Sequence, residues 1–403
     1  MTSHPTGPSG RGAPTADLFE MLTMFRPGSP LTRADVIRRT GLSRSTANQR
    51  LDALMAARLV VTAESGTSTG GRPASLFTFN RNRGVLLVAD IGATAMRVAL
   101  CDLGGTVLTE VEQRMDVSDG PVPVLSCVGD HFDKLLSDTG HVPSDVLGIG
   151  LDVPGPVDFS SGRVVSPPIM TGWDRFDIPG WFVAGYDCPV VVDKDVNAMA
   201  VGEHQFSYPE ISHLMMLKVG TGVGSGLIAS GKVHRGADGA AGDIGHIQLA
   251  LPDDADGEPL CRCGNTGCVE AYAGGWAMAR DLRANGNVDV RSVDDVLRLL
   301  QAGDVSAQRL LRRAGRILGR AVADAVNLFN PRIIAVSGQL AHTDEQLLAG
   351  IREVVYQRSL PLATRNLQIV RSRLDPRAGL VGLSALLSEE IFSEHRLSRL
   401  IME

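Results

Sequence analysis

The sequence has no long apolar run. None of its hydrophobic stretches approaches the roughly 20 consecutive apolar residues that a membrane-spanning helix needs. Its first residues are rich in Pro, Gly and Ser, without the apolar core of a signal peptide. We therefore expect a cytoplasmic protein with no membrane partner.

Cysteine is also scarce, and its distribution is uneven. Six cysteines occur in 403 residues, and three of them, Cys261, Cys263 and Cys268, fall close together in one short segment. The other three are scattered. This distribution suits reduced thiols with one metal site better than a disulfide framework.

Lysine is absent from the first 84 residues, yet this segment is basic. It holds 11 Arg and 5 acidic residues, a net charge of +6, whereas the rest of the chain has a net charge of −12. Such asymmetry predicts that the N-terminal segment binds a polyanion, although a solvated basic surface would have the same composition. The length of 403 residues and the 44% hydrophobic content predict two or three structural units.

The first of these units is predicted over residues 16–80, after a tail. Residues 1–15 contain almost no apolar side chains, so we expect them to be disordered. Apolar spacing of three and four then predicts a helix that ends before Pro27. Thr32 is a good N-cap for a second helix, and Gly41 suits its end.

A third predicted helix begins after Ser43 and presents hydrogen-bonding side chains outward. Such side chains can bond to base edges or phosphates. Two β-rich runs, 59–62 and 76–79, then flank a Gly-rich tip that carries Arg72. This order predicts a winged helix-turn-helix DNA-binding domain, with a plain three-helix packing module as the alternative. The candidate DNA-binding residues are Ser43, Arg44, Ser45, Thr46, Asn48, Gln49, Arg50 and Arg72.

Residues 85–403 have the apolar strands, Gly-rich turns and amphipathic helices of an α/β domain. Two turns in it could hold phosphate, because backbone N–H groups can surround an anion where no Cβ intervenes. For the second turn, a tight β-turn without a ligand is an equal alternative. The residues concerned are Asp90, Gly92 and Thr94 in the first turn, and Gly220, Thr221, Gly222 and Gly224 in the second.

Asp195 follows a predicted strand and opens a predicted helix. A carboxylate at this place can accept a proton from a hydroxyl group, although Asp is also a common helix N-cap.

The segment from Cys261 to Cys268 carries the strongest local signal. Three thiolates in a short Gly-containing loop need one more ligand for a closed tetrahedral zinc site, and His246 lies a short loop upstream. We expect His246, Cys261, Cys263 and Cys268 to bind structural zinc. Chance clustering of buried cysteines is the alternative.

Taken in order, these motifs resemble the ROK family of bacterial sugar kinases and sugar-responsive repressors. The motifs are Asp90 to Thr94, Pro154 to Val157, Asp193 to Asn197, Gly220 to Gly226, Asp243 to His246, and Cys261 to Cys268 followed by Glu270. The resemblance implies an α/β fold of the actin-like ATPase type, with two lobes and a sugar in the cleft between them. With the N-terminal module, the chain is similar to the repressor branch.

The resemblance also implies roles for individual residues. Asp195 would be the catalytic base, and His246 would contact both the zinc and the sugar through different ring nitrogens. The implied sugar-binding residues are Lys194, Asp195, Asp243, His246 and Glu270, and ATP would be the second ligand of a kinase.

Three residues depart from the pattern that family kinases usually have. The chain has Ala93 where a second glycine is usual, Lys194 where Asn is usual, and Asp243 where Glu is usual. Each departure changes the site, whereas Asp90, Gly92, Thr94 and the second glycine turn remain. Kinase activity therefore stays open.

We predict a sugar-responsive transcriptional regulator, a repressor, that binds operator DNA and senses a sugar or sugar phosphate. The alternatives are an ATP-dependent sugar kinase with an added DNA-binding head, and a sugar kinase whose head is an interaction module only. One recognition helix covers few base pairs, so we also expect a homodimer or homotetramer on an inverted repeat.

Overall fold

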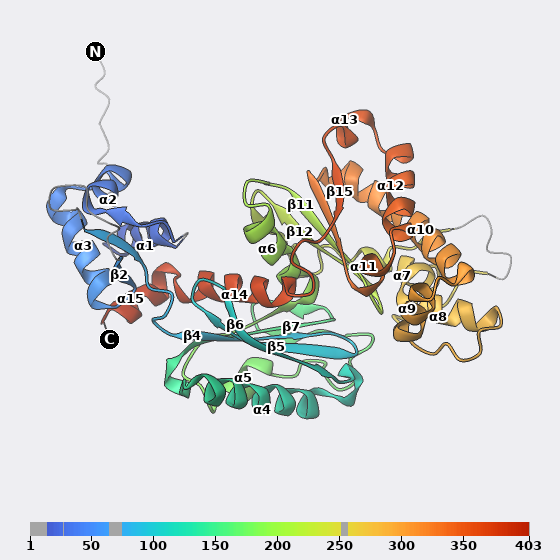
Figure 1. Ribbon diagram of the computed structural model, residues 1–403, viewed down its shortest axis with the longest axis horizontal. Coiled ribbons are helices and arrows are strands. Elements are labelled where there is room, and N and C mark those ends of the chain that lie inside the picture. Colours follow the sequence, from blue (N-terminus) through green and yellow to red (C-terminus); the bar gives the residue numbers. More distant parts are fainter. Residues whose placement is uncertain (1–13, 27, 64–74, 251–256, 403) are drawn as a thin grey trace, which may run out of the picture.

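The computed structural model describes residues 14–26, 28–63, 75–250 and 257–402. A small N-terminal head lies at one end of a body with two five-stranded sheets, and the first and last described helices, which begin at Pro14 and end at Met402, both lie at the head (Figure 1). This is the expected α/β architecture. Among the described residues, no helix is long and apolar enough to cross a membrane.

The head consists of three helices and a small antiparallel sheet with strand order β1-β3-β2. Thr32 and Asp35 form the predicted cap, since each residue's side chain accepts a hydrogen bond from the other's backbone N–H. Gly41 ends the second helix with a left-handed φ of 67°. The elements are α1 (Pro14–Phe25), β1 (Leu31–Thr32), α2 (Arg33–Thr40), α3 (Arg44–Ala56), β2 (Val60–Ala63) and β3 (Leu76–Phe79). The predicted tail lies outside the described residues up to residue 13, and α1 begins at Pro14.

The first lobe of the body is a mixed sheet with strand order β10-β7-β4-β5-β6. Strands β7 and β4 of this sheet are almost wholly buried because helices cover both faces of the sheet. Helix α4 (Pro121–Thr139) lies on one face and α14 (Ala378–Ile391) on the other. The strands are β4 (Val85–Ile91), β5 (Ala95–Asp102), β6 (Val107–Arg114), β7 (Val146–Val153) and β10 (Val190–Lys194). A small hairpin, β8 (Val157–Asp158) with β9 (Arg163–Val164), and α5 (Ile178–Val183) complete this lobe.

The second lobe is built on a sheet with strand order β13-β12-β11-β14-β15. Helix α6 (Asp195–Ser207) covers one face, and the long α10 (Val305–Phe329) with α12 (Gln346–Arg358) lies on the other side (Figure 1). The strands are β11 (Leu214–Val219), β12 (Val223–Ala229), β13 (Lys232–Val233), β14 (Ile333–Ser337) and β15 (Gln368–Arg371). The shorter helices are α7 (Val269–Ala273), α8 (Gly275–Ala284), α9 (Val293–Gln301), α11 (Gln339–Thr343) and α13 (Pro361–Thr364).

Helices α6 and α14 pack against each other with very small residues between them. A Cβ added at Gly382 would lie 1.7 Å from the Ala198 backbone oxygen, and one at Gly202 would lie 2.3 Å from the Ala378 oxygen. The two helix backbones are therefore in direct contact. Only glycine permits this approach.

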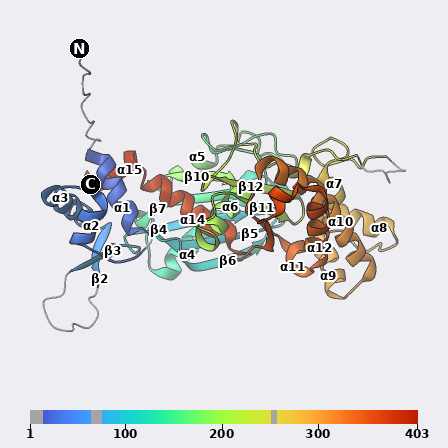
Figure 2. The same ribbon diagram turned by 90° about the horizontal axis from the view of Figure 1, so that it is seen from above.

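After α14 the chain returns to the head. Helix α15 (Glu394–Met402) packs against α1 and α3, on the side of the head that faces the body (Figures 1 and 2). Phe79 and Phe392 meet edge to face with ring centroids 5.5 Å apart. Buried head residues and the C-terminal helices thus share one hydrophobic core.

Candidate functional site

One cavity of about 510 Å³ lies between the two lobes of the body. All twelve residues that the sequence suggested for sugar or nucleotide line it, although they come from segments up to 180 residues apart. They are Asp90, Gly92, Thr94, Lys194, Asp195, Gly220, Thr221, Gly222, Gly224, Asp243, His246 and Glu270. Their roles toward a ligand remain predictions.

The turn between β11 and β12 is braced by Glu270. The Val223 backbone N–H donates to Glu270 Oε2 at 2.9 Å, and Trp276 Nε1 donates to Oε1 at 3.2 Å. A Cβ at Gly222 would lie 2.5 Å from Glu270 Oε2. Glycine is therefore needed here for contact with a protein carboxylate, and that carboxylate already has two partners.

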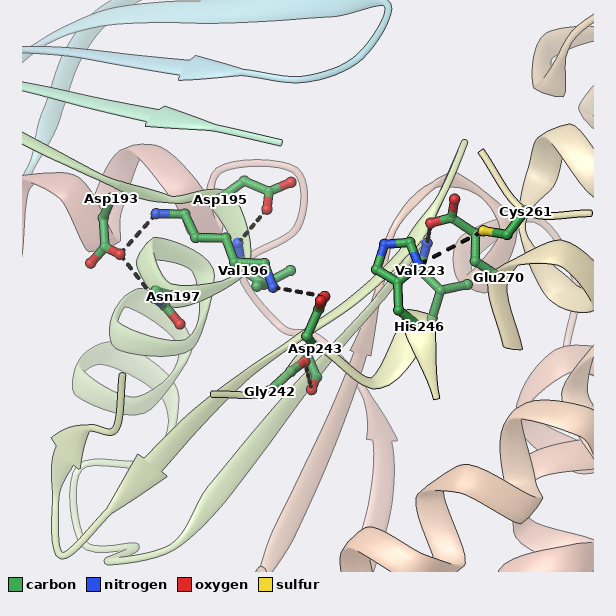
Figure 3. Close-up of polar contacts among 12 residues, drawn as sticks. Asp193, Asp195, Val196, Asn197, Val223, Gly242, Asp243, His246, Cys261 and Glu270 are labelled. Carbon is green, nitrogen blue, oxygen red and sulfur yellow. Dashed lines mark hydrogen bonds and ion pairs between the residues drawn. The ribbon is translucent and has the colours of Figure 1, made fainter. Parts of the chain in front are cut away.

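The end of β10 places three charged side chains in or beside the cavity. Asp193 is buried, accepts a hydrogen bond from Asn197 Nδ2 at 2.8 Å and pairs with Arg235 Nη2 at 2.6 Å. Lys194 Nζ lies 3.4 Å from Asp243 Oδ1, so two of the departures noted above face each other. Figure 3 shows Asp243 between the β10 side chains and His246.

Both carboxylate oxygens of Asp195 have protein partners. Oδ1 accepts the Val196 backbone N–H at 2.7 Å, and Oδ2 lies 2.7 Å from Lys218 Nζ. The sequence analysis did not single out Lys218. Its signal is one charge inside the otherwise apolar strand β11.

Asp152, next to the cavity-lining Asp90, is a second group that the sequence did not identify. It is fully buried at the end of β7. A Cβ added at Gly379 would lie 3.1 Å from Asp152 Oδ2 and 2.6 Å from Asp90 Oδ2, so these two oxygens lie near each other. Burial and the adjacent Asp90 charge raise the pKa of Asp152 well above its usual value. Burial likewise raises the pKa of Asp90. A carboxyl group inside an apolar strand was the available signal.

A third missed group is Asp375, which lines the cavity beside β14. Its Oδ2 accepts from Ser337 Oγ at 2.9 Å and from the Gly338 N–H at 3.0 Å, and lies 2.5 Å from His342 Nε2. Burial raises the pKa of Asp375, but these three partners outweigh burial and hold it below its usual value. No local motif in the sequence marks this cluster.

The four predicted metal ligands come together beside the cavity. The ligand atoms of His246, Cys261, Cys263 and Cys268 all lie within 4.8 Å of one another. Cys261 Sγ is 3.7 Å from His246 Nδ1, and Cys263 Sγ is 3.7 Å from Cys268 Sγ. A tetrahedral ion with Zn–S bonds of about 2.3 Å has ligand separations of about 3.8 Å, so the donor set and its spacing fit a metal.

The thiols of this cluster must lose protons to bind a metal. Burial and the neighbouring Cys263 and Cys261 side chains raise the pKa of Cys268 to about 12. A bound cation would displace that proton.

The predicted DNA contacts lie on α3 and at its N-cap. Ser43, Arg44, Ser45 and Gln49 are exposed, whereas Thr46, Asn48 and Arg50 are partly buried. Asn48 Oδ1 accepts a hydrogen bond from Arg33 Nη1 at 3.0 Å, so part of its capacity is used within the head. Arg72 lies outside the described residues.

Comparisons with known proteins agree with this architecture. The model of the ROK family matches residues 87–390. The xylose repressor of Caldicellulosiruptor bescii is 29% identical over 376 residues, covering 90% of this chain and 93% of the repressor. A crystal structure of a ROK family transcriptional regulator, a homolog of the E. coli MLC protein, has a TM-score of 0.79 at 24% identity and covers 97% of this chain and 99% of its own.

A sugar kinase structure matches the body alone. The ROK family glucokinase from Streptomyces griseus, in complex with glucose and AMPPNP, has a TM-score of 0.62 at 28% identity. It covers 75% of this chain and 99% of its own. The actin-like fold expected for the body is thereby confirmed.

Proposed function

This chain belongs to the ROK family, and from that premise we propose that it is a sugar-responsive transcriptional repressor. The observation that carries the proposal is the extent of the likeness to the xylose repressor, which takes in 90% of this chain and 93% of that protein. The likeness therefore extends into the N-terminal head and is not limited to the body. A sugar kinase such as the Streptomyces griseus glucokinase matches 75% of the chain.

In this proposal the head binds operator DNA through α3 and its N-cap. The exposed Arg44 would contact a phosphate or a base edge in the major groove, because these are the groups that a guanidinium binds best. One such helix covers a short half-site. We propose a two-fold homodimer, or a pair of dimers, on an inverted repeat.

The cleft would bind a sugar or sugar phosphate. Asp195, Asp243, His246 and Glu270 line one cavity and supply the carboxylates and the imidazole that hydrogen-bond to sugar hydroxyls. The cavity of about 510 Å³ has the size of a small-ligand site. Relatives suggest D-xylose and D-glucose as the first sugars to test.

Zinc is the metal proposed for the cluster of one His and three Cys. His246, Cys261, Cys263 and Cys268 would hold it, and four protein ligands leave no open position for an activated water. Bound zinc supplies structural bracing. His246 directs Nδ1 toward Cys261, which leaves Nε2 as the ring nitrogen available to a sugar. Glu270 lies two residues after Cys268, so zinc bound to the Cys loop would help to position Glu270 as well as His246.

Asp195→Asn tests whether this cleft is the sensing site. The variant should lose affinity for the sugar that the wild type binds, measured by calorimetry over a sugar panel, while its affinity for genomic DNA fragments stays unchanged. Asp187→Asn, at an exposed position, is the matched control. Unchanged sugar affinity in Asp195→Asn would remove this residue from the site.

The second candidate function is ATP-dependent sugar phosphorylation. It is favoured by the Asp90, Gly92 and Thr94 turn, which lines the same cavity as the second glycine turn. An ATP-coupled assay over the same sugar panel distinguishes a kinase from a sensor. A DNA-binding assay at several salt concentrations then tests whether the head does more than bind a protein, because phosphate contacts release counterions and give a salt slope.

A further inference from the structure

Lys218 projects from β11 toward the carboxyl groups of the cleft. Its Nζ lies 2.7 Å from Asp195 Oδ2, and its side chain is 26% exposed. Lys218 stands two residues before Gly220, where the glycine turn begins. The ammonium therefore lies where the two lobes face each other across the cavity.

Three carboxyl groups interact with this one ammonium. Burial alone would lower the pKa of Lys218, but its interactions with the nearby carboxyl groups, led by the ion pair with Asp195, outweigh burial and raise the pKa above its usual value. The environment of Lys218 therefore favours its charged form. Asp152 is fully buried, and Asp90 lies beside it.

A kinase would need a divalent cation in this region. Phosphoryl transfer from ATP uses Mg²⁺ to bridge phosphate oxygens, and one or two protein carboxylates commonly hold that ion. Here the carboxyl groups near the phosphate-type turns, those of Asp195, Asp90 and Asp152, already interact with the Lys218 ammonium. A dication beside Lys218 would meet a like charge at close range, so Mg²⁺ does not fit the site as it stands.

We propose that Lys218 is a built-in cation that takes the place of a divalent metal among the cleft carboxylates. The cleft then keeps its charge balance without metal, and it binds a sugar without transferring phosphate to it. The inference rests on the proposed function in one respect, namely that this cleft is the sensing site.

The same contact affects how Asp195 meets a ligand. Because Val196 and Lys218 already bond to its two oxygens, a sugar hydroxyl must share an oxygen with Lys218 or displace its ammonium. Lys218 is accordingly a positioning residue for Asp195. Binding of a sugar at Asp195 should be insensitive to Mg²⁺ in the wild type.

The test is titration of Mn²⁺, as the probe, into the zinc-loaded full-length protein, followed by electron paramagnetic resonance. Lys218→Met removes the charge and keeps the length of the side chain, and it should bind one Mn²⁺ per chain roughly tenfold or more tightly than the wild type. Lys232→Met on β13 is exposed and serves as the control, with no gain expected. Adding Asp195→Asn to Lys218→Met should remove the gained site.

Two results would overturn the proposal: wild-type protein that binds Mn²⁺ in the cleft, or Lys218→Met that gains none. If Lys218→Met does not fold by circular dichroism, Lys218→Gln provides the same measurement with a neutral side chain that can still donate to Asp195. Failure of the proposed function has a separate signature. In that case wild-type DNA binding would not respond to sugar, whatever the Mn²⁺ titration shows.

Discussion

Replacing Arg235 by methionine should destabilise the body, because it breaks a buried ion pair next to the cleft. Arg235 donates from Nε and Nη2 to Asp193 Oδ2 at 3.0 and 2.6 Å, and the two side chains are only 18% and 2% exposed. Its guanidinium also lies over the Phe159 ring, 3.6 Å from the centroid. Methionine keeps the apolar stem and removes the charge.

The magnitude follows from the burial of Asp193. Removing one partner of a buried ion pair costs about 3–5 kcal/mol, because a carboxylate is left uncompensated. Asn197 Nδ2 and the Lys194 N–H still donate to Oδ1, which favours the low end of that range. We expect the free energy of unfolding to fall by about 3 kcal/mol. Asp193→Asn combined with Arg235→Met should recover most of this loss, since position 193 then carries no uncompensated charge.

Urea unfolding followed by tryptophan fluorescence measures the effect in the body, where all three tryptophans, Trp173, Trp181 and Trp276, are found. The control is Lys134→Met, which breaks an exposed 2.9 Å pair with Asp138 and should change stability little. The reasoning is refuted if Arg235→Met unfolds within about 1 kcal/mol of the wild type, or if the double variant is no more stable than Arg235→Met.

Three further predictions concern the metal, the DNA and the glycine turn. Zinc affinity should fall as the pH is lowered, because protons compete with the metal for the thiols and the pKa of Cys268 is raised to about 12. Competition with a chelator at several pH values measures this, and a pH-independent zinc affinity would contradict it. Arg44→Ala should weaken binding to DNA fragments and reduce the salt slope by about one, measured by fluorescence anisotropy; an unchanged slope would exclude a phosphate contact. Gly222→Ala places a Cβ 2.5 Å from Glu270 Oε2, so the variant should bind sugar more weakly, measured by calorimetry, while its metal content stays at the wild-type value. A sugar affinity equal to that of the wild type would mean that Glu270 is not needed for sugar binding.

The parts of the fold that depend on neighbours in sequence could be predicted. The Thr32 cap and the Gly41 helix end follow from local hydrogen bonding and backbone freedom, and both are present. The Cys261 to Cys268 loop was recognisable because its ligands are close in sequence. His246, 15 residues before Cys261, completes the set.

The groups that sequence analysis missed are those whose meaning depends on distant partners. Lys218 looks like an exception in an apolar strand until Asp195, 23 residues away, is seen beside it. Asp375 likewise acquires its role from Ser337, 38 residues away. The packing of the C-terminal helix α15 on the head could not be predicted either. The change of sequence pattern at residues 80–84 marks where the head ends along the chain, but it does not tell which later segment returns to it.

The glycine contact between α6 and α14 limits how the two helices can move. Backbones held this closely resist sliding, so a shift at Asp195, where α6 begins, would turn α14 as a lever. Its 14 residues make an arm of about 21 Å, and a tilt of about 5° would carry its far end by about 2 Å. Helix α15 continues from that end to pack on α1 and α3. A displacement of about 2 Å is also the size of shift by which helices at subunit interfaces switch between states.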